Sequence, residues 1–440
     1  MNFKLLIKKC LDEGIKDVEI YSLSTKSNSV EMLNDKAEKN ESSNLNVSNI
    51  RAVYNNHIVS TYVENMTDEN IDAIIKRLKD EATYVENTDP FFMYEGEDEY
   101  DKLELKDNDL DSFTLEDMTN YLKELDKEAK KRSKYVVTTE SSIGTTFEKK
   151  EITNTKGLNV SQEEKVGIIF FSVVVRKDEE VKTSYAFTPF KNFKDIDKEK
   201  LLADSVDVAV NKLGATSYKS GQYKVLIKNT CMLSLLGAFS SQFLASSVMK
   251  KMSSLDGKIG EKIFGDNINI LDDPYINEFN MNAFDDEGVK TRTKAVVRNG
   301  KLETYLYNLQ TAAFFNTKTT GNGFKNGIKG ELSVSPTNFY LQKGENSFDE
   351  LLKLVDNGVY ITDLQGLHAG LNPISGAFNL QSQGFLIENG KITKPLTLII
   401  LSGNFFEMMK NVKYIGSDLE FRSKFGAPSI VVDKLAVSGK

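Results

Sequence analysis

The sequence predicts an α+β protein of two domains, each with a mainly antiparallel sheet and segregated helices. Its 440 residues are enough for roughly two or three domains. β-rich stretches recur in both halves, with helices set apart from them and no short-period repeat. A polar, glycine-containing stretch, "TSYKSGQY", separates the halves. We therefore expect one domain at residues 1–217 and a second, β-rich domain at residues 218–440.

Helical and strand patterns follow one another through the first half. Residues 3–14 predict a short amphipathic helix that ends at Gly14, a residue suited to a left-handed cap. Residues 18–32 alternate like a strand, and residues 50–64 predict a hairpin with Asn55-Asn56 at the turn. The other expected elements are strands between 135 and 186 and helices at 68–82 (capped by Thr67), 115–132 (capped by Thr114 with Asp117) and 197–215.

The second half begins with a strand at 223–229 and then a helix at 231–251, "CMLSLLGAFSSQFLASSVMKK". One face of this helix is apolar, with Met232, Leu235, Leu236, Phe239 and Phe243. The opposite face is small and nearly uncharged, with Ser234, Ala238, Ser241 and Ala245. A solvated helix face usually carries Lys and Glu. Either another element packs there, or small residues stand where a reactive group once stood.

Asn-Gly dipeptides mark two further hairpins, because they supply the two positive φ angles of a type I′ turn. In the second hairpin Glu388 and Lys391 flank the turn and can pair across the strands. The remaining elements are the hairpins at 294–308 and 384–395, helices at 347–358 and 403–416, and a last strand at 428–439.

Composition and charge exclude several classes of protein. The net charge is −8 and the basic residues are scattered among acidic ones, which argues against nucleic acid as a partner. Cys10 and Cys231 are too few and too far apart for a disulfide framework or a cysteine-rich metal site. The N-terminal stretch is too charged for a signal peptide, and the longest apolar run, 166–175, is too short to cross a membrane. We expect a cytoplasmic protein with no membrane partner.

Three short motifs have weak chemical meaning. "TTGNGFKNG" lacks the spacing of a phosphate-binding loop, so we expect a mobile or tightly turning loop, and "DDPYINEFNMNAFDDEG" lacks the spacing of a calcium loop, so we expect no dedicated calcium site there. Ser247 and Lys250 match Ser-x-x-Lys, a nucleophile and base pair, but the companion signatures are missing. We favour a small residue and a solvent lysine. His57 and His368 have no nucleophile elbow to complete a triad.

The stretch "GLHAGLNPISGAF" has an unusual density of glycine around His368. It is either a tight turn between strands or a loop that lines a groove, with His368 or Asn372 contacting a ligand. Under the second interpretation the candidate peptide-binding residues are His368, Gly370, Asn372, Ser375 and Gly376.

Several long motifs, in order, make the chain resemble the TldD/PmbA family, long called modulators of DNA gyrase and now regarded as metallopeptidases. They are "ITNTKGLNVSQ", "FDDEGVKT", "TTGNG", "GLHAGLNPISGAFNL", "GFLIENGKITKP", "SGNFFEMMKNVKYIGSDLE" and "PSIVVDKLAVSGK". "IRAVYNNHIVSTY" fits more loosely, because His57 stands near a usual glycine.

The family contains two kinds of subunit, and the resemblance implies that this chain is of the second kind. TldD-like chains hold zinc with a His-Glu-x-x-x-His helix and a cysteine near the C-terminus, whereas PmbA-like (TldE) chains lack these groups and pair with the first kind. At the positions of the metal motif this chain has Gly237, Ala238 and Gln242, and "FRSKFGAPS" contains no cysteine. A catalytic zinc needs about three such ligands. We therefore expect no catalytic residue, metal ligand or cofactor in this chain.

The resemblance implies a non-zinc subunit of a cytoplasmic peptidase complex. Zinc and the general base would come from a TldD-like partner, the substrates would be unfolded or short peptides, and a homodimer is an option for the isolated chain. Two alternatives belong to other classes. One is a self-sufficient hydrolase, for instance through Ser247 and Lys250, and the other is a non-proteolytic interaction protein such as a gyrase modulator.

Overall fold

The computed structural model describes residues 3–86, 90–103 and 108–440, which form two compact units. Unit 1 runs to Val210 and also contains residues 282–291 and 323–333. Unit 2 contains residues 211–281, 292–322 and 334–440. The main division therefore falls after residue 210, where the sequence placed it after residue 217. The sequence did not predict that two segments of the second half belong to unit 1.

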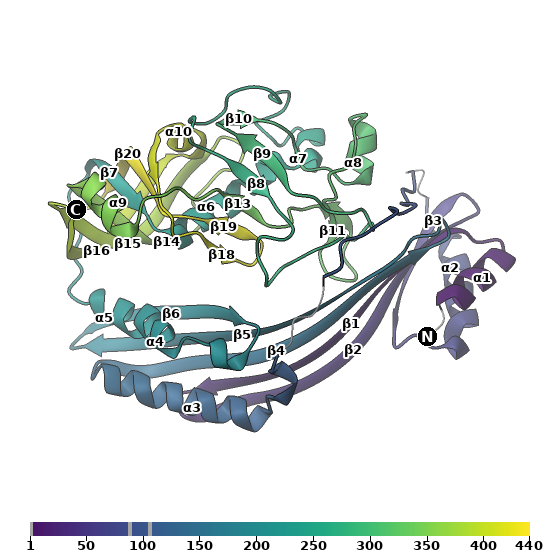
Figure 1. Ribbon diagram of the computed structural model, residues 1–440, viewed down its shortest axis with the longest axis horizontal. Coiled ribbons are helices and arrows are strands. Elements are labelled where there is room, and N and C mark those ends of the chain that lie inside the picture. Colours follow the sequence, from purple (N-terminus) through teal and green to yellow (C-terminus); the bar gives the residue numbers. More distant parts are fainter. Residues whose placement is uncertain (1–2, 87–89, 104–107) are drawn as a thin grey trace. The chain divides into compact units, whose positions relative to one another are not determined.

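Unit 1 is built on one antiparallel sheet with the strand order β3-β2-β1-β4-β5-β6 (Figure 1). The strands are β1 (Lys16–Leu33), β2 (Lys36–Tyr54), β3 (His57–Glu64), β4 (Val136–Asn154), β5 (Asn159–Lys177) and β6 (Glu180–Phe190). Several are far longer than the usual strand of about 5–6 residues. The Asn55-Asn56 turn is confirmed, because both residues have positive φ and Tyr54 pairs with His57.

Helices cover parts of this sheet. Helix α1 (Phe3–Asp12) and α2 (Ile71–Glu81) bury Leu6, Ile74 and Leu78 with residues of β1, β2 and β3. Helix α3 (Leu115–Arg132) begins with the predicted capping box, in which the Asp117 N–H donates to the Thr114 hydroxyl at 3.1 Å. The short remaining helical turns are η1 (Asp68–Asn70), η2 (Leu110–Ser112), η3 (Phe193–Asp195), α4 (Lys198–Leu202), η4 (Ala203–Asp207) and α5 (Val208–Asn211).

Two predictions for unit 1 were wrong in detail. The helix expected at 197–215 widens into a π turn at η4, where the Ser205 hydroxyl donates to the Leu201 carbonyl, and it ends at Asn211. The first part of β2, residues 36–46, was not predicted as a strand at all. Its sequence, "KAEKNESSNLN", has little β propensity, and every side chain is exposed. Pairing with β1, interrupted at Glu38, holds it extended.

Unit 2 contains two larger sheets and a two-stranded one, and it confirms the α+β class. In the first sheet, β16-β15-β14-β7-β20-β17, an extra pairing of β16 with β20 closes five strands into a ring. Its strands are β7 (Gly221–Ile227), β14 (Gly358–Gln365), β15 (Ala377–Glu388), β16 (Lys391–Asn404), β17 (Val412–Ile415) and β20 (Ile430–Ser438). The predicted Asn389-Gly390 turn is confirmed, with Glu388 paired to Lys391.

The second sheet of unit 2 has the order β10-β9-β8-β13-β19-β18. Its strands are β8 (Ile270–Asp272), β9 (Lys294–Arg298), β10 (Lys301–Leu302), β13 (Phe339–Leu341), β18 (Glu420–Arg422) and β19 (Phe425–Ala427). Asn299 and Gly300 make its predicted hairpin turn, each with positive φ. The two-stranded sheet consists of β11 (Gly323–Lys325) and β12 (Leu332–Val334).

The helices of unit 2 are shorter than predicted. The helix expected at 231–251 divides into α6 (Asn229–Phe239), a 3-10 turn η5 (Ser240–Phe243) and α7 (Ala245–Met249). The helix expected at 403–416 stops after one and a half turns as α10 (Phe405–Lys410), and β17 follows. The other two are α8 (Leu309–Phe314) and α9 (Phe348–Val355).

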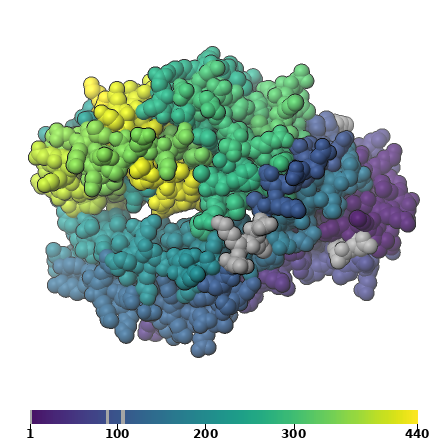
Figure 2. Space-filling model, in the orientation of Figure 1, coloured from purple at the N-terminus to yellow at the C-terminus, as the bar shows by residue number. Residues whose placement is uncertain are grey.

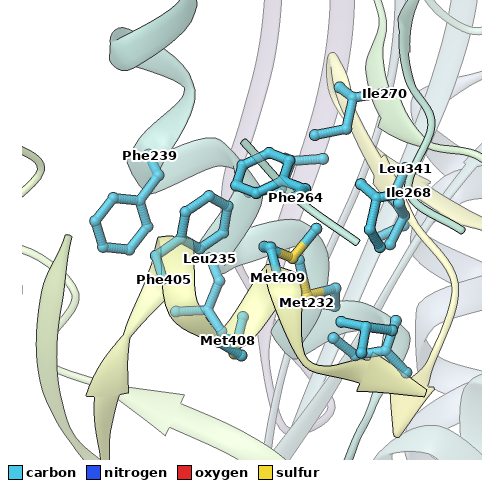
Figure 3. Packing of buried hydrophobic residues seen from close by; sticks show 14 of the residues in the cluster. Met232, Leu235, Phe239, Phe264, Ile268, Ile270, Leu341, Phe405, Met408 and Met409 are labelled. Carbon is cyan, nitrogen blue, oxygen red and sulfur yellow. The ribbon is translucent and has the colours of Figure 1, made fainter. Parts of the chain in front are cut away.

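Helix α6 lies at the centre of the unit 2 core (Figure 3). Met232, Leu235 and Phe239 are fully buried, and the Phe239 ring stacks on Phe405 of α10 with centroids 4.4 Å apart. Figure 2 shows one face of the outer surface, on which the C-terminal residues of unit 2 are green to yellow. None of the helices in the described residues is long and apolar enough to cross a membrane.

Candidate functional site

The small face of α6 is covered by another element of unit 2. A Cβ added to Gly237 would lie 3.1 Å from the ring of Phe425 on β19. Ser234 turns back on its own helix and donates to the Thr230 carbonyl at 2.7 Å. Phe425 therefore packs against this face at Gly237, while Ser234, Ala238 and Ser241 remain half-buried.

Gln242, the third position of the metal motif, is a structural residue. It is fully buried in the turn η5 that interrupts the predicted helix. Its amide nitrogen donates to the Met252 carbonyl at 3.1 Å, and its amide oxygen accepts from the Ser254 N–H at 2.8 Å. Both ends of the amide therefore hold the loop after α7, and the break in the helix is what directs the side chain there.

The residues at these positions do not fit a zinc ion. Gly237 and Ala238 have no donor atom, and Gln242 uses its amide on the loop. Among the described residues, no group of three or more His, Cys, Asp or Glu side chains is placed to hold a metal. A catalytic zinc site of His, Cys or carboxylate ligands cannot be assembled on this helix.

Ser247 and Lys250 are not arranged as a nucleophile and base. Ser247 lies on α7, and Lys250 is an exposed residue at its C-terminal cap. The structure describes both residues and records no hydrogen bond between their side chains. His57 begins β3 in unit 1, and its Nδ1 is buried without a hydrogen-bond partner in the described part of the chain.

The glycine-rich stretch 366–376 connects β14 to β15 as a structured surface loop. The Asn372 side-chain oxygen accepts from the N–H groups of Ile374 and Ser375, each at 3.0 Å. The Ser375 carbonyl in turn accepts from the Asn404 amide at 2.7 Å. Asn372 is therefore occupied in building a turn, whereas the His368 side chain is exposed at the tip.

Two glycines of this loop are required by its own packing. A Cβ at Gly370 would lie 2.4 Å from the Asn379 carbonyl oxygen, and Gly376 has φ +79° with Phe406 close by. The glycine density thus has a local structural cause. Of the five predicted peptide-binding residues, His368, Asn372 and Ser375 are exposed. The side chains of Asn372 and Ser375 accept hydrogen bonds from N–H groups of the loop, so His368 is the exposed residue whose replacement leaves those bonds in place.

Sequence analysis missed a buried ionic site in unit 1, formed by the "FDDEG" motif. The Asp285 carboxylate accepts from the N–H groups of Glu287 (3.0 Å), Val289 (2.9 Å) and Gly323 (2.8 Å). Burial raises the pKa of Asp285 to about 7. The Asp286 carboxylate receives the Lys150 ammonium at 3.0 Å and the Lys325 N–H at 2.8 Å. These acidic side chains are thus buried. In the sequence, the apolar residues beside them, such as Phe284, were the feature that could have indicated this burial.

Two lysines complete this site, the buried Lys150 and the half-buried Lys325. Lys150 on β4 donates to the Phe284 carbonyl and lies 5.0 Å from the Phe284 ring centroid. Lys325 donates to the Asn49 side-chain oxygen at 2.9 Å and lies over the Tyr21 ring. Burial lowers the pKa of Lys325 to about 8. The site holds residues 282–291 and 323–333 within unit 1.

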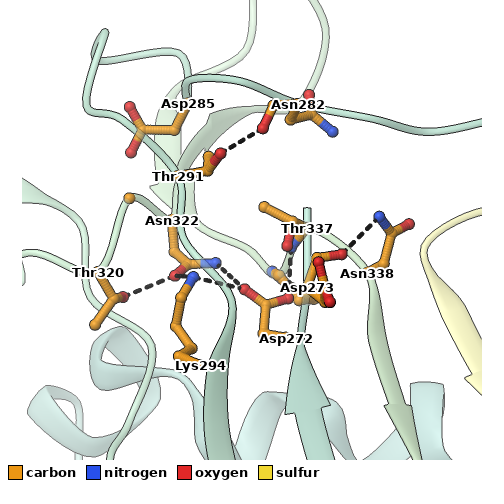
Figure 4. Close-up of polar contacts among 12 residues, drawn as sticks. Asp272, Asp273, Asn282, Asp285, Thr291, Lys294, Thr320, Asn322, Thr337 and Asn338 are labelled. Carbon is orange, nitrogen blue, oxygen red and sulfur yellow. Dashed lines mark hydrogen bonds and ion pairs between the residues drawn. The ribbon is translucent and has the colours of Figure 1, made fainter. Parts of the chain in front are cut away.

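A second polar site in unit 2 orders the "TTGNG" stretch (Figure 4). Asp272 is fully buried and accepts from Lys294 (3.0 Å), Asn322 (2.8 Å) and the Thr337 N–H (2.8 Å). Asn322 also accepts from the Thr320 hydroxyl at 2.7 Å. Gly321 has φ +69°, so the expected tight turn is confirmed.

Three domain models of one protein family match the chain. The PmbA/TldA metallopeptidase domain 1 matches residues 18–82, the central domain 108–213 and the C-terminal domain 220–439. The fold is thus that of a metallopeptidase family. The chain belongs to the PmbA/TldD family.

Relatives and solved structures agree with this assignment. An uncharacterised protein of Methanocaldococcus jannaschii is 32% identical over 63% of this chain and 64% of its own length. A metalloprotease of Archaeoglobus fulgidus is 33% identical over 50% of this chain and 51% of its own length. The chain thus matches between about half and just under two thirds of these relatives.

Two solved structures match 99% of this chain and 99% of their own length. One is a Thermotoga maritima protein solved under the name of a DNA gyrase modulator, with 29% identity and a TM-score of 0.90. The other is TldE of Thermococcus kodakarensis, with 20% identity and a TM-score of 0.90, which shows a shared fold.

We predict that Lys150→Ala lowers the free energy of unfolding by about 3 kcal/mol, because it leaves Asp286 buried without its cation. Chemical denaturation measures this loss. The matched control is Lys149→Ala, which removes a partly exposed lysine paired with Glu151 at 3.0 Å and should cost less than about 1 kcal/mol. Equal effects of the two substitutions would show that the buried pair does not stabilise unit 1.

The lowered pKa of Lys325 predicts that the free energy of unfolding depends on pH. Its folded pKa of about 8 lies below the unfolded value of about 10.4, so between these pH values the unfolded chain binds more protons. The Lys325 contribution to the unfolding free energy therefore rises with pH across this window. We expect Lys325→Met to remove that rise in denaturation series from pH 7 to 10. Lys329→Met, at an exposed position of the same segment, should keep it. An unchanged slope in Lys325→Met would contradict the assignment.

Proposed function

We propose that this chain is a PmbA/TldE-like, non-zinc subunit of a cytoplasmic peptidase complex. A TldD-like partner supplies the zinc ion and the general base, and this chain contributes structure and part of the peptide-binding surface. The observation that carries the proposal is the α6 segment, where Gly237 and Ala238 offer no ligand and Gln242 is bound to the loop after α7.

The named relatives support a role in proteolysis. A 25% identical protein of Escherichia coli O157:H7 is named metalloprotease PmbA, and it matches over 61% of this chain and 57% of its own length. The substrates we propose are unfolded or short peptides, because an extended chain can pair its backbone with a strand edge. The exposed His368, on a loop rigidified by its own hydrogen bonds, is the proposed contact to the peptide.

One observation favours a second function. The Thermotoga maritima protein, with a fold that matches over 99% of both chains, carries the name of a gyrase modulator. Under this alternative the chain acts by binding another protein and takes no part in peptide hydrolysis. The two functions differ in whether a mixture with a TldD-like subunit cleaves peptides.

We expect the isolated, chelator-washed chain to hold no stoichiometric zinc and to leave an unstructured peptide uncleaved, whereas a mixture with a TldD-like subunit cleaves it. Elemental analysis and peptide mass spectrometry on the same preparations measure both properties. Ser247→Ala should leave the mixed activity intact. About one zinc ion per isolated chain, or loss of cleavage in a folded Ser247→Ala complex, would refute the proposal.

His368→Ala should weaken peptide binding by the complex about fivefold, which corresponds to the loss of one neutral hydrogen bond of about 1 kcal/mol. Fluorescence anisotropy of a labelled peptide measures the dissociation constant. The matched control is His57→Ala, at the other histidine of the chain, and should leave peptide binding unchanged. If His368→Ala assembles and binds peptide like the parent, the loop has only a structural role.

A further inference from the structure

Helices cover one face of the unit 1 sheet at its two ends (Figure 1). At one end, helix α2 shares a core with Ile20 of β1. At the other end, the Thr139 hydroxyl of β4 donates to Asp126 of α3 at 2.6 Å. Alternate residues of a strand point to the same face. The side chains of Lys26 on β1 and of its partner Phe147 on β4 therefore lie on this face, between the two helical covers.

Two rows of directly paired residues line a cavity in this middle part of the face. The first row crosses β2, β1, β4 and β5 and consists of Asn44, Lys26, Phe147 and Lys165. The next row adds Asn28 and Thr145. Leu110 and Asp111 of η2 also line the cavity, whose volume is about 430 Å³. This volume lies in the range of small-molecule sites, which is roughly 300–1,000 Å³.

The charged groups of the cavity leave one lysine unpaired. On the β5 side of Phe147, the Lys165 ammonium donates to the Asp111 carboxylate. On the β1 side, Lys26 is exposed, and within the described residues the structure records no hydrogen bond or ion pair for its ammonium. The lining thus holds two cations and one anion, which leaves an excess of one positive charge beside Phe147.

The other lining groups suit a ligand with hydroxyl groups. The Ser42 hydroxyl donates to the Asn28 side-chain oxygen at 2.7 Å, so the Asn28 amide N–H groups remain as donors. Asn44 and Thr145 add a second amide and a hydroxyl. The negative face of the Phe147 ring attracts the slightly positive C–H groups of a sugar ring. These features together favour a polar ring compound over an apolar one.

We propose that this cavity binds a sugar carboxylate, a hydroxylated ring with a single negative charge. The carboxylate pairs with Lys26, the ring lies on Phe147, and the hydroxyl groups bond to Asn28 and to the Asp111 carboxylate. A monoanion matches the single excess positive charge, whereas a neutral sugar leaves Lys26 unpaired. Every lining residue belongs to unit 1, whereas the α6 segment, which carries the proposed peptidase function, belongs to unit 2. The two functions can therefore be tested separately.

Isothermal titration calorimetry of the full chain with D-glucuronate tests this site. We expect binding that Lys26→Met weakens at least tenfold, because the carboxylate loses its cation. The matched control is Lys149→Met, two residues along β4 from Phe147. Lys149 is already paired with Glu151 at 3.0 Å, so its loss should leave binding unchanged.

Two further probes separate the charge of the sugar acid from its ring. Glucose has the hydroxyl groups without the charge, and acetate has the charge without the ring. Each should bind at least tenfold more weakly than D-glucuronate, because each makes only part of the contacts.

Protection from labelling locates the bound sugar acid without a substitution. Saturating D-glucuronate should slow acetylation of Lys26 by an N-hydroxysuccinimide ester at least fivefold and leave that of Lys149 unchanged. Peptide mass spectrometry measures both rates. Because Lys26 is exposed, Lys26→Met should unfold at the same denaturant concentration as the parent.

Several outcomes would overturn this assignment. One is that D-glucuronate does not bind in the millimolar range, and another is that a folded Lys26→Met chain binds it like the parent. Equal binding of acetate would show an adventitious anion only, and equal binding of glucose would show that Lys26 has no part. Protection of Lys149 in place of Lys26 would put the sugar acid elsewhere on the sheet.

Discussion

The return of residues 282–291 and 323–333 to unit 1 depends on a buried ionic site. Taking Lys150 and Asp286 out of water costs several kcal/mol per ion unless each finds its partner and the remaining hydrogen bonds are made. Here every requirement is met: Asp286 receives an ammonium and a backbone N–H, and Asp285 receives three backbone N–H groups. The partners come from separate segments, so these contacts form only when residues 282–291 and 323–333 lie against the sheet of unit 1. The site therefore specifies which segments belong to unit 1 as much as it stabilises them.

Unit 2 also contains a buried carboxylate whose hydrogen bonds order a turn. The Asp272 carboxylate accepts hydrogen bonds from a lysine, an asparagine amide and a backbone N–H. These contacts order the turn at 319–323. Two of the motifs by which the chain resembles its family thus have structural roles here. "FDDEG" supplies buried carboxylates, which accept hydrogen bonds from backbone N–H groups and a lysine. "TTGNG" supplies a turn.

The α6 segment contributes core packing and the turn that follows it contributes a buried hydrogen-bonded amide. Phe425 packs against Gly237 of α6, and Gln242 in the following turn η5 holds the loop after α7. Both features add packing and hydrogen bonds at positions where a catalytic site would need open coordination and water.

The sequence by itself determined the α+β class, the family, and the features that depend on neighbouring residues. The Asn55-Asn56 and Asn389-Gly390 turns and the Thr114 cap were predicted because positive φ and capping depend on adjacent side chains. Only the tertiary structure decided the rest. Residues 36–46 are a strand because β1 offers a partner, and the helix from 231 breaks at η5, where Gln242 accepts a hydrogen bond from the Ser254 N–H. Lys150 meets Asp286 across more than a hundred residues, and no local pattern records a contact at that separation.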